Sequence, residues 1–300
     1  MNKKIKYYYR QRVLISLLEE FGGRLNNLDF QKYLFLFTET CQNGRSYEFV
    51  PFKYGCFSFQ SYADRRKLVE LGVLKGGDAW EIEDGVTFRT TLKSDDRIKI
   101  QQFHQKYRAI KGHDLVREVY TQYPYFALRS EIKSKVLSNK ELAQIEAAKP
   151  LFEKPCLFSI GYEGRSFENY LNALIKNDIR IVIDVRKNPL SRKYGFSKKT
   201  LSETLTKLDI RYQHFPELGI RSEKRQSLKS QDDYNRLFDE FEKTVLTYNA
   251  ASIRRLFDIF TRFERIALTC FEADVCMCHR GRVAQALETL PEWTYNVKHI

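Results

Sequence analysis

The stretch RIALTCFEADVCMCHRGRVAQAL, residues 265–287, joins an apolar run to a helical pattern. The run at 265–270 predicts a buried strand, and the apolar residues at 283–290 repeat at helical spacing. Two carboxylates, three thiols, an imidazole and two guanidiniums lie between or beside them. An α/β fold places ligands at such a strand-to-helix turn, because the helix N-terminus offers free N–H groups. The stretch therefore predicts an α/β domain with its site at this turn.

The rest of residues 151–300 extends this pattern. Including the strand before the turn, apolar runs predict five strands, at 157–162, 179–185, 212–215, 266–270 and 295–299. Helical patterns alternate with them at 167–176, 197–208, 234–248 and 250–262. This alternation predicts a parallel sheet with right-handed crossovers and helices on both faces.

Polar residues follow four of these strands, at 161–165, 184–191, 216–219 and 272–280. The carboxyl ends of parallel strands share one edge, so we expect one pocket there. The catalytic candidates are Glu163, Asp184, Glu272, Cys278 and His279. The candidates for binding phosphate are Arg165, Arg186, Ser191 and Arg280. The alternative is a structural ion-pair network of Asp184, Arg186 and Glu272.

Several of these motifs resemble one known family, DUF488, over about residues 156–300. They comprise 159–166, 184–186 with 188–191, 195–197, Tyr212, 216–219, 270–273 and 278–280. The resemblance implies an α/β fold with a basic cleft, and the family has no firmly assigned activity. It makes Cys278, His279 and Arg280 the pattern residues, whereas Cys276 falls at an open position. The family recurs beside DNA-related and defence-related genes in bacteria, which favours nucleic acid by association.

The first half of the chain has a different pattern. The first half predicts three helices, at 7–21, from Asp29 and at 58–71. A small hairpin of 73–74, 80–82 and 86–88 is expected after them. This order is typical of a winged helix, whose third helix would present Arg65, Arg66 and Lys67 outward to a nucleic-acid groove. The alternative is a solvated basic face.

Parts of this half, 30–34 with 54–58, also resemble the SocA-like (Panacea) domains over about 60 residues, with Cys56 in place of a proline. Residues 94–150 are polar and helical in pattern. We therefore expect a winged-helix-like domain at 1–92, a helical connector at 93–150 and the α/β domain at 151–300.

Composition points to the class of partner. The 300 residues carry a net charge of +13, about +8 of it in residues 1–150 and about +5 in 151–300. This charge favours a polyanionic partner, which we expect to be a nucleic acid or a nucleotide. A basic insertion after Gly219 contains Arg221 and Arg225 beside the expected pocket, where they would follow phosphates.

The sequence also bears on location. No apolar run is long enough to span a membrane, so we expect no membrane association. Six cysteines without a framework spacing favour free thiols in the cytoplasm. The oligomeric state is not predicted.

The candidate residues favour an enzyme that acts on a nucleic acid or nucleotide, by hydrolysis of a phosphoester or glycosidic bond. The arginines would hold phosphate through bidentate contacts. The carboxylates would supply a base or bind Mg²⁺, and His279 would act as a general acid. The cofactor is otherwise unknown.

Three alternatives remain open. Cys276 and Arg282 have the spacing of phosphatase-type loops, which favours a cysteine nucleophile. However, the residues between them are bulky, whereas such loops are usually rich in glycine. Cys278 is the better thiol by the family pattern, but it lacks that spacing. Cys270, Cys276, Cys278 and His279 are clustered, but they lack the paired spacing of zinc sites, so we do not expect structural zinc. The third alternative is a non-catalytic sensor that binds nucleic acid or a nucleotide.

Overall fold

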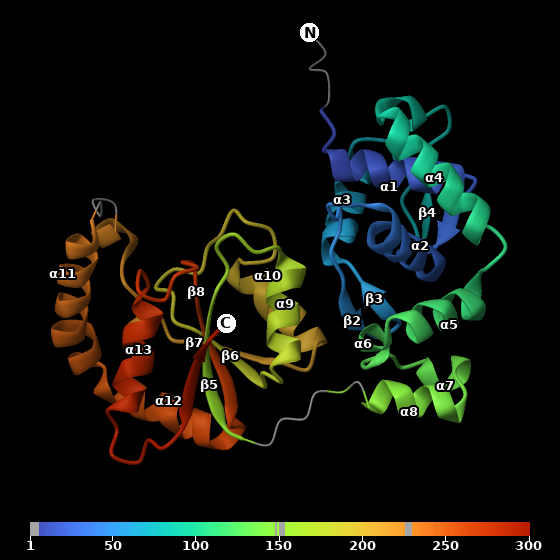
Figure 1. Ribbon diagram of the computed structural model, residues 1–300. Coiled ribbons are helices and arrows are strands. Elements are labelled where there is room, and N and C mark those ends of the chain that lie inside the picture. Colours follow the sequence, from blue (N-terminus) through green and yellow to red (C-terminus); the bar gives the residue numbers. More distant parts are fainter. Residues whose placement is uncertain (1–5, 148, 150–153, 226–229) are drawn as a thin grey trace, which may run out of the picture. The chain divides into compact units, whose positions relative to one another are not determined.

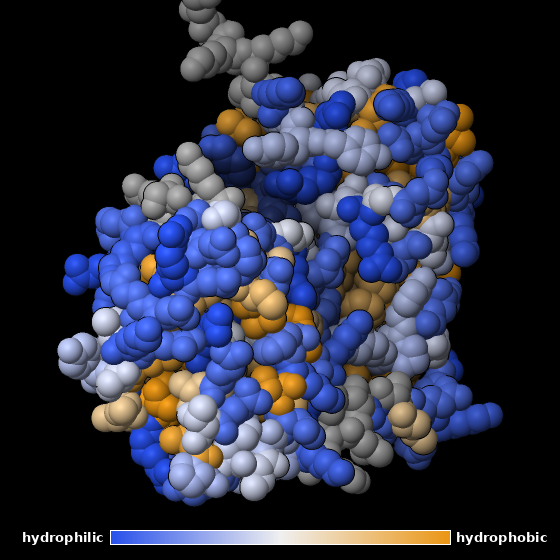
Figure 2. Space-filling model, turned by 60° about the vertical axis from the view of Figure 1, so that its left-hand side comes forward, coloured by the Kyte–Doolittle hydropathy of each residue, from blue (hydrophilic) through white to orange (hydrophobic). Residues whose placement is uncertain are grey.

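The computed structural model describes residues 6–147, 149, 154–225 and 230–300. The chain divides into two compact units, residues 1–149 and 150–300, and each has its own hydrophobic core (Figure 1). None of the described helices combines the length and the hydrophobicity that a membrane crossing requires. The face seen in Figure 2 is mainly hydrophilic, with small separate hydrophobic patches.

The N-terminal unit is mostly helical. Its α-helices are α1 (Tyr9–Glu20), α2 (Asn27–Cys41), α3 (Phe59–Glu70), α4 (Ser94–Tyr107), α5 (Gly112–Gln122), α6 (Pro124–Ala127), α7 (Lys133–Val136) and α8 (Asn139–Ala147), with a short 3₁₀ turn η1 at Arg89–Thr91. Strand β1 (Arg24–Asn26) pairs antiparallel with β4 (Ala79–Glu81), and β2 (Val50–Phe52) pairs with β3 (Gly55–Phe57). The side chains of Asn26 and Ser58 cap α2 and α3.

Helix α2 lies at the centre of this unit, because ten consecutive residues from Asp29 to Thr38 are buried. Helices α4 and α5 pack against it. The Tyr33 hydroxyl donates a hydrogen bond to the Ile110 carbonyl over 2.7 Å. The segment that the sequence suggests as a connector therefore shares one core with the preceding helices.

The expected hairpin is present only in part. Leu74 forms an antiparallel bridge with Ile82, but residues 86–88 form no strand, and β4 pairs with β1, Trp80 standing opposite Leu25. Residues 87 and 88 are held by α1, because the Glu19 carboxylate accepts hydrogen bonds from the Thr87 hydroxyl and the Phe88 N–H. This tertiary contact has no local pattern in the sequence.

The C-terminal unit contains a five-stranded, fully parallel sheet, as expected. Its strands are β5 (Cys156–Gly161), β6 (Ile181–Asp184), β7 (Arg211–His214), β8 (Arg265–Cys270) and β9 (Asn296–His299), in the order β7-β6-β8-β5-β9. Its α-helices are α9 (Phe167–Lys176), α10 (Lys198–Lys207), α11 (Gln231–Phe241), α12 (Ala250–Phe263) and α13 (His279–Glu288). Shorter turns are η2 (Pro216–Leu218), η3 (Ser222–Arg225) and the π turn η4 (Glu242–Leu246).

Helices cover both faces of this sheet: Figure 1 shows α9 and α10 on one side and α11, α12 and α13 on the other. Alternate strand residues such as Ile183 and Leu268 belong to the core with α12 and α13. On the opposite face, the Tyr170 hydroxyl of α9 donates to Thr269 over 3.0 Å. All six residues of β5 and of β8 are buried, which explains why these strands appear in the sequence as continuous apolar runs.

Candidate functional site

The sheet brings the polar segments after β5, β6, β7 and β8 to one edge. In the register, Asp184 stands opposite both His214 of β7 and Thr269 of β8, and Gly161 stands opposite Cys270. All of these residues lie at or next to the carboxyl ends of their strands. The segments that carry the predicted site residues of this unit therefore start side by side.

Asp184 and Arg186 form a buried ion pair at this edge. Asp184 is 0% and Arg186 is 6% exposed. Arg186 donates from Nε to Oδ1 over 2.8 Å and from Nη2 to Oδ2 over 2.6 Å. The Tyr212 hydroxyl also donates to Oδ2, over 2.6 Å. Burial lowers the pKa of Arg186, but the hydrogen bonds and charge of Asp184 outweigh burial and raise the pKa above its ordinary value.

These contacts give Arg186 and Asp184 a structural role at this edge, whereas the phosphate-binding and catalytic roles suggested by the sequence stay predictions. Arg186 Nη1 donates to the Tyr162 hydroxyl and to the Phe196 carbonyl over 2.9 and 2.8 Å. Both oxygens of Asp184 already accept hydrogen bonds, so a Mg²⁺ ion would have to displace them. The structural ion pair that the sequence left as an alternative is present for these two residues.

Arg280 is also a structural residue. Its side chain is 1% exposed, and its guanidinium donates to the carbonyls of Glu272 and Ala273, the latter over 2.9 Å. Nε lies 3.3 Å from Ser159 Oγ. Its donors bind the backbone of the loop after β8, whereas the phosphate contact stays a prediction. Sequence spacing gives the position of a guanidinium but not the direction in which it turns.

The loop after β8 passes close to the end of β5. A Cβ atom on Gly161 would overlap the Glu272 carbonyl oxygen, so only glycine allows this approach. Glu163, which is exposed, accepts a hydrogen bond from the Ala273 N–H over 3.0 Å. The contacts of Gly161 and Glu163 with this loop, together with those of Arg280, fix its path.

Two thiols and an imidazole meet beneath this loop. The ligand atoms of Cys270, Cys278 and His279 all lie within 4.8 Å of one another, and all three residues are buried. His279 Nε2 is 2.8 Å from the Val185 carbonyl oxygen, and Nδ1 is 3.7 Å from Cys270 Sγ. The Cys270 thiol also lies 3.3 Å from Glu272 Oε2. Among the described residues, this is the group of histidine, cysteine and carboxylate side chains arranged to hold a metal ion.

The environment of Cys278 does not favour a nucleophilic thiolate. Burial, and then the neighbouring Cys270 thiol, raise the pKa of Cys278 well above the ordinary value of a thiol. Cys276 is exposed and lies outside the cluster. A cysteine nucleophile needs the opposite shift, so this environment does not support Cys278 in that role.

A cavity of about 290 Å³ opens at this edge, and we call it the sheet-edge cavity. Cys270, His279 and Arg186 form part of its wall, and Lys187, Ser191 and Arg192 come from the loop after β6. Ser191 Oγ accepts a hydrogen bond from the Lys193 N–H over 3.1 Å. Arg165 is half-buried at the start of the segment after β5 and is not among the residues that line this cavity.

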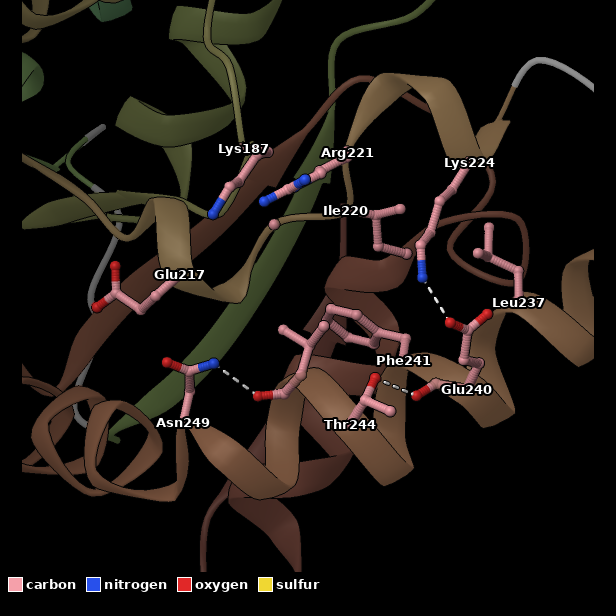
Figure 3. A pocket seen from close by; sticks show the side chains of 12 residues that line it. Lys187, Glu217, Ile220, Arg221, Lys224, Leu237, Glu240, Phe241, Thr244 and Asn249 are labelled. Atoms are coloured by element: carbon pink, nitrogen blue, oxygen red, sulfur yellow. Dashed lines mark hydrogen bonds and ion pairs between the residues drawn. The ribbon is translucent and has the colours of Figure 1, made fainter.

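A second cavity of about 440 Å³, the insertion cavity, shares Lys187 and Ile220 with the first. Figure 3 shows the side chains of Lys187 and Arg221 extending into the same space, whereas Lys224 turns to Glu240. Arg225 lies in η3, but its side chain lies outside the described part of the chain. Sequence reasoning missed Lys187 and Arg192, although both follow β6 at the predicted edge.

The basic residues of α3 are arranged differently from the expectation. Arg65 Nη2 donates to the Gly77 carbonyl over 2.7 Å, and its guanidinium lies 5.3 Å from the centre of the Trp80 ring. Arg65 therefore holds the segment before β4 and is not presented outward. Arg66 is exposed, and Lys67 pairs with Glu70 over 2.9 Å.

The family model of the domain of unknown function DUF488 matches residues 166–287, which confirms the resemblance of the C-terminal half. No curated protein and no solved structure matches the chain.

Proposed function

From the premise that residues 166–287 of the C-terminal unit match the DUF488 family, we propose that its sheet-edge and insertion cavities bind phosphate groups of a nucleic acid or a nucleotide. One observation carries this proposal: three exposed cations, Lys187, Arg192 and Arg221, line the two cavities. Among the described residues, none of the three forms an ion pair with a carboxylate.

Cations without a partner are what a phosphate ligand requires, because no existing ion pair has to be broken when the ligand binds. Most other cations at this edge are engaged: Arg186 and Arg280 donate to protein groups, and Lys224 pairs with Glu240. Lys187 belongs to both cavities, so the cations form one connected basic surface. The net charge of +13 adds long-range attraction for a polyanion.

The test measures binding of the full chain to a short labelled duplex and to a nucleoside triphosphate over a range of salt concentrations. We expect Lys187→Ala, Arg192→Ala and Arg221→Ala to weaken binding. Each lost contact with duplex phosphate should reduce the slope of log affinity against log salt by about 0.9. A steep salt dependence of duplex binding, equivalent to several phosphate contacts, indicates a nucleic acid. Binding of the nucleoside triphosphate without binding of the duplex indicates a nucleotide.

The matched control is Lys207→Ala. Lys207 is an exposed cation at the end of α10, before β7 starts, and therefore lies towards the opposite edge of the sheet. Its removal changes the net charge by the same amount as each test variant. If Lys207→Ala weakens binding as much as Arg192→Ala, general charge explains the binding, and the proposed cavities do not.

A second proposal is hydrolysis of a phosphoester or glycosidic bond in the bound ligand. The supporting observation is Glu272, whose carboxylate lies 3.3 Å from the thiol of Cys270, a residue in the wall of the sheet-edge cavity. A carboxylate there would act as a base toward water. We expect Glu272→Gln to abolish turnover of an oligonucleotide and to leave its affinity unchanged. Equal turnover by both proteins would exclude Glu272 as the base, and no turnover by the wild-type chain would leave binding as the function.

A further inference from the structure

Cys270, Cys278 and His279 have the geometry of metal ligands. Zinc in a tetrahedral site has bonds of about 2.3 Å to sulfur and about 2.0 Å to nitrogen, which places neighbouring ligand atoms roughly 3.5 Å apart. Cys270 Sγ and His279 Nδ1 are 3.7 Å apart. The Cys278 thiol completes a triangle in which all separations are within 4.8 Å.

The imidazole is held in the orientation that a metal ligand needs. Its Nε2 lies 2.8 Å from the Val185 carbonyl oxygen, which can only accept a hydrogen bond. The proton therefore belongs on Nε2, and Nδ1 presents a lone pair to the two thiols. A backbone carbonyl in this position is the usual outer partner of a metal-bound histidine.

The ligands also come from rigid parts of the fold. Cys270 is the last residue of β8, and His279 is the first residue of α13. Arg280 and Gly161 fix the loop between them through contacts with the carbonyls of Glu272 and Ala273. The three side chains are already close together in the folded chain, so binding requires little rearrangement.

We propose that Cys270 Sγ, Cys278 Sγ and His279 Nδ1 bind one Zn²⁺ ion. The sequence argued against zinc because the four clustered residues lack the usual paired spacing, but the structure leaves Cys276 exposed and brings Cys270, Cys278 and His279 together. Each thiol loses its proton to solvent when its sulfur binds the ion, and no oxidation or reduction takes place. The fourth position is left to the Glu272 carboxylate or to water from the sheet-edge cavity, which Cys270 and His279 line.

This site does not depend on the proposed phosphate binding. Its ligands are two thiols and an imidazole, whereas the phosphate contacts come from Lys187, Arg192 and Arg221. Metal content and duplex affinity are separate measurements, so the failure of one proposal is distinguishable from the failure of the other.

The test is the zinc content of the full chain, purified under reducing conditions, loaded with zinc and freed of excess ion by gel filtration. We expect about one zinc ion per chain. Cys270→Ser and Cys278→Ser should each lose most of the bound zinc. Cys276→Ser is the matched control, because it removes an exposed thiol of the same loop, and it should keep the wild-type zinc content.

A measurement on the unaltered chain protects the test against variants that fail to fold. Cobalt added in place of zinc should give the near-ultraviolet absorption of thiolate-to-cobalt charge transfer, and zinc should displace it. The proposal is overturned if the wild-type chain holds neither metal, or if Cys276→Ser loses as much zinc as Cys278→Ser. A Cys270–Cys278 disulfide in the reduced and zinc-treated chain, detected by mass spectrometry, would also overturn it.

Discussion

At the level of single residues, Asp184 shows how the sheet edge is held together. Its side chain is 0% exposed, and each carboxylate oxygen accepts two hydrogen bonds from Arg186 or Tyr212. A charge without exposure to water is tolerated only when such partners replace its hydration. The pair therefore ties β6 to β7, and through Tyr162 it reaches the end of β5.

Replacement of Asp184 by asparagine should destabilise the C-terminal unit by about 3–5 kcal/mol, because it leaves the Arg186 charge buried without its partner. Hydrogen exchange followed by mass spectrometry on peptides from β6 and β8 measures this loss within the full chain. Asp258→Asn is the control, because Asp258 is 66% exposed and its ion pair with Arg254 spans 3.7 Å. Unchanged exchange in Asp184→Asn would show that the pair does not stabilise the unit.

Lys32 in α2 gives a prediction about pH. It is 1% exposed, and its ammonium group donates to the carbonyls of Tyr54 and Cys56. Burial lowers its pKa below 10.5, against the opposing effects of Cys56 and Asp29. Between the lowered pKa and 10.5, the unfolded chain binds more protons than the folded chain, so stability rises with pH in this window.

The measurement compares urea denaturation of the wild-type chain and of Lys32→Met at neutral and at alkaline pH. Because only the wild-type chain carries the buried ammonium, its stability relative to Lys32→Met should increase as the pH rises. Lys53→Met serves as control, since Lys53 is 54% exposed. A difference that shrinks with pH, or that Lys53→Met reproduces, would contradict the lowered pKa.

At the level of elements, the contact of β5 with the loop after β8 decides whether the site can form. A Cβ on Gly161 would overlap backbone atoms of Glu272. Backbone atoms cannot rotate away from a clash as the end of a flexible side chain can. We expect Gly161→Ala to destabilise the C-terminal unit by about 1–3 kcal/mol and to displace the loop. Zinc content and urea denaturation measure both effects. Gly44→Ala is the control, because nothing lies within 4 Å of the position that a Cβ would occupy there.

Elements of the sheet follow closely from the sequence, whereas the partners of individual side chains do not. Strands such as β6 and β8 are predicted because strands covered on both faces are mainly apolar. Their parallel order then determines which loops share an edge. The outward position of Arg65 is wrong, because its guanidinium turns to the Gly77 carbonyl, and Arg280 likewise turns to the carbonyls of its own loop. No local pattern encodes such contacts, and for the same reason the sequence misses the contact of residues 87 and 88 with Glu19.

At the level of the whole molecule, the chain consists of two units with separate cores. The net charge is divided between the halves, about +8 in residues 1–150 and about +5 in 151–300. Lys187, Arg192 and Arg221, which carry the proposed phosphate contacts, all belong to the second unit. Local recognition therefore belongs to the second unit, whereas both units contribute to long-range attraction.

This division predicts how residues 150–300 behave when they are produced alone. A unit with its own core should fold cooperatively by itself. It should bind the duplex less tightly than the full chain, because it lacks the charge of the first unit. The fold-loss of affinity caused by Arg192→Ala should be the same in the fragment and in the full chain, because its cavity lies within the fragment. Circular dichroism and salt-dependent binding check these outcomes. A folded fragment in which Arg192→Ala has no effect would place the binding site outside the C-terminal unit.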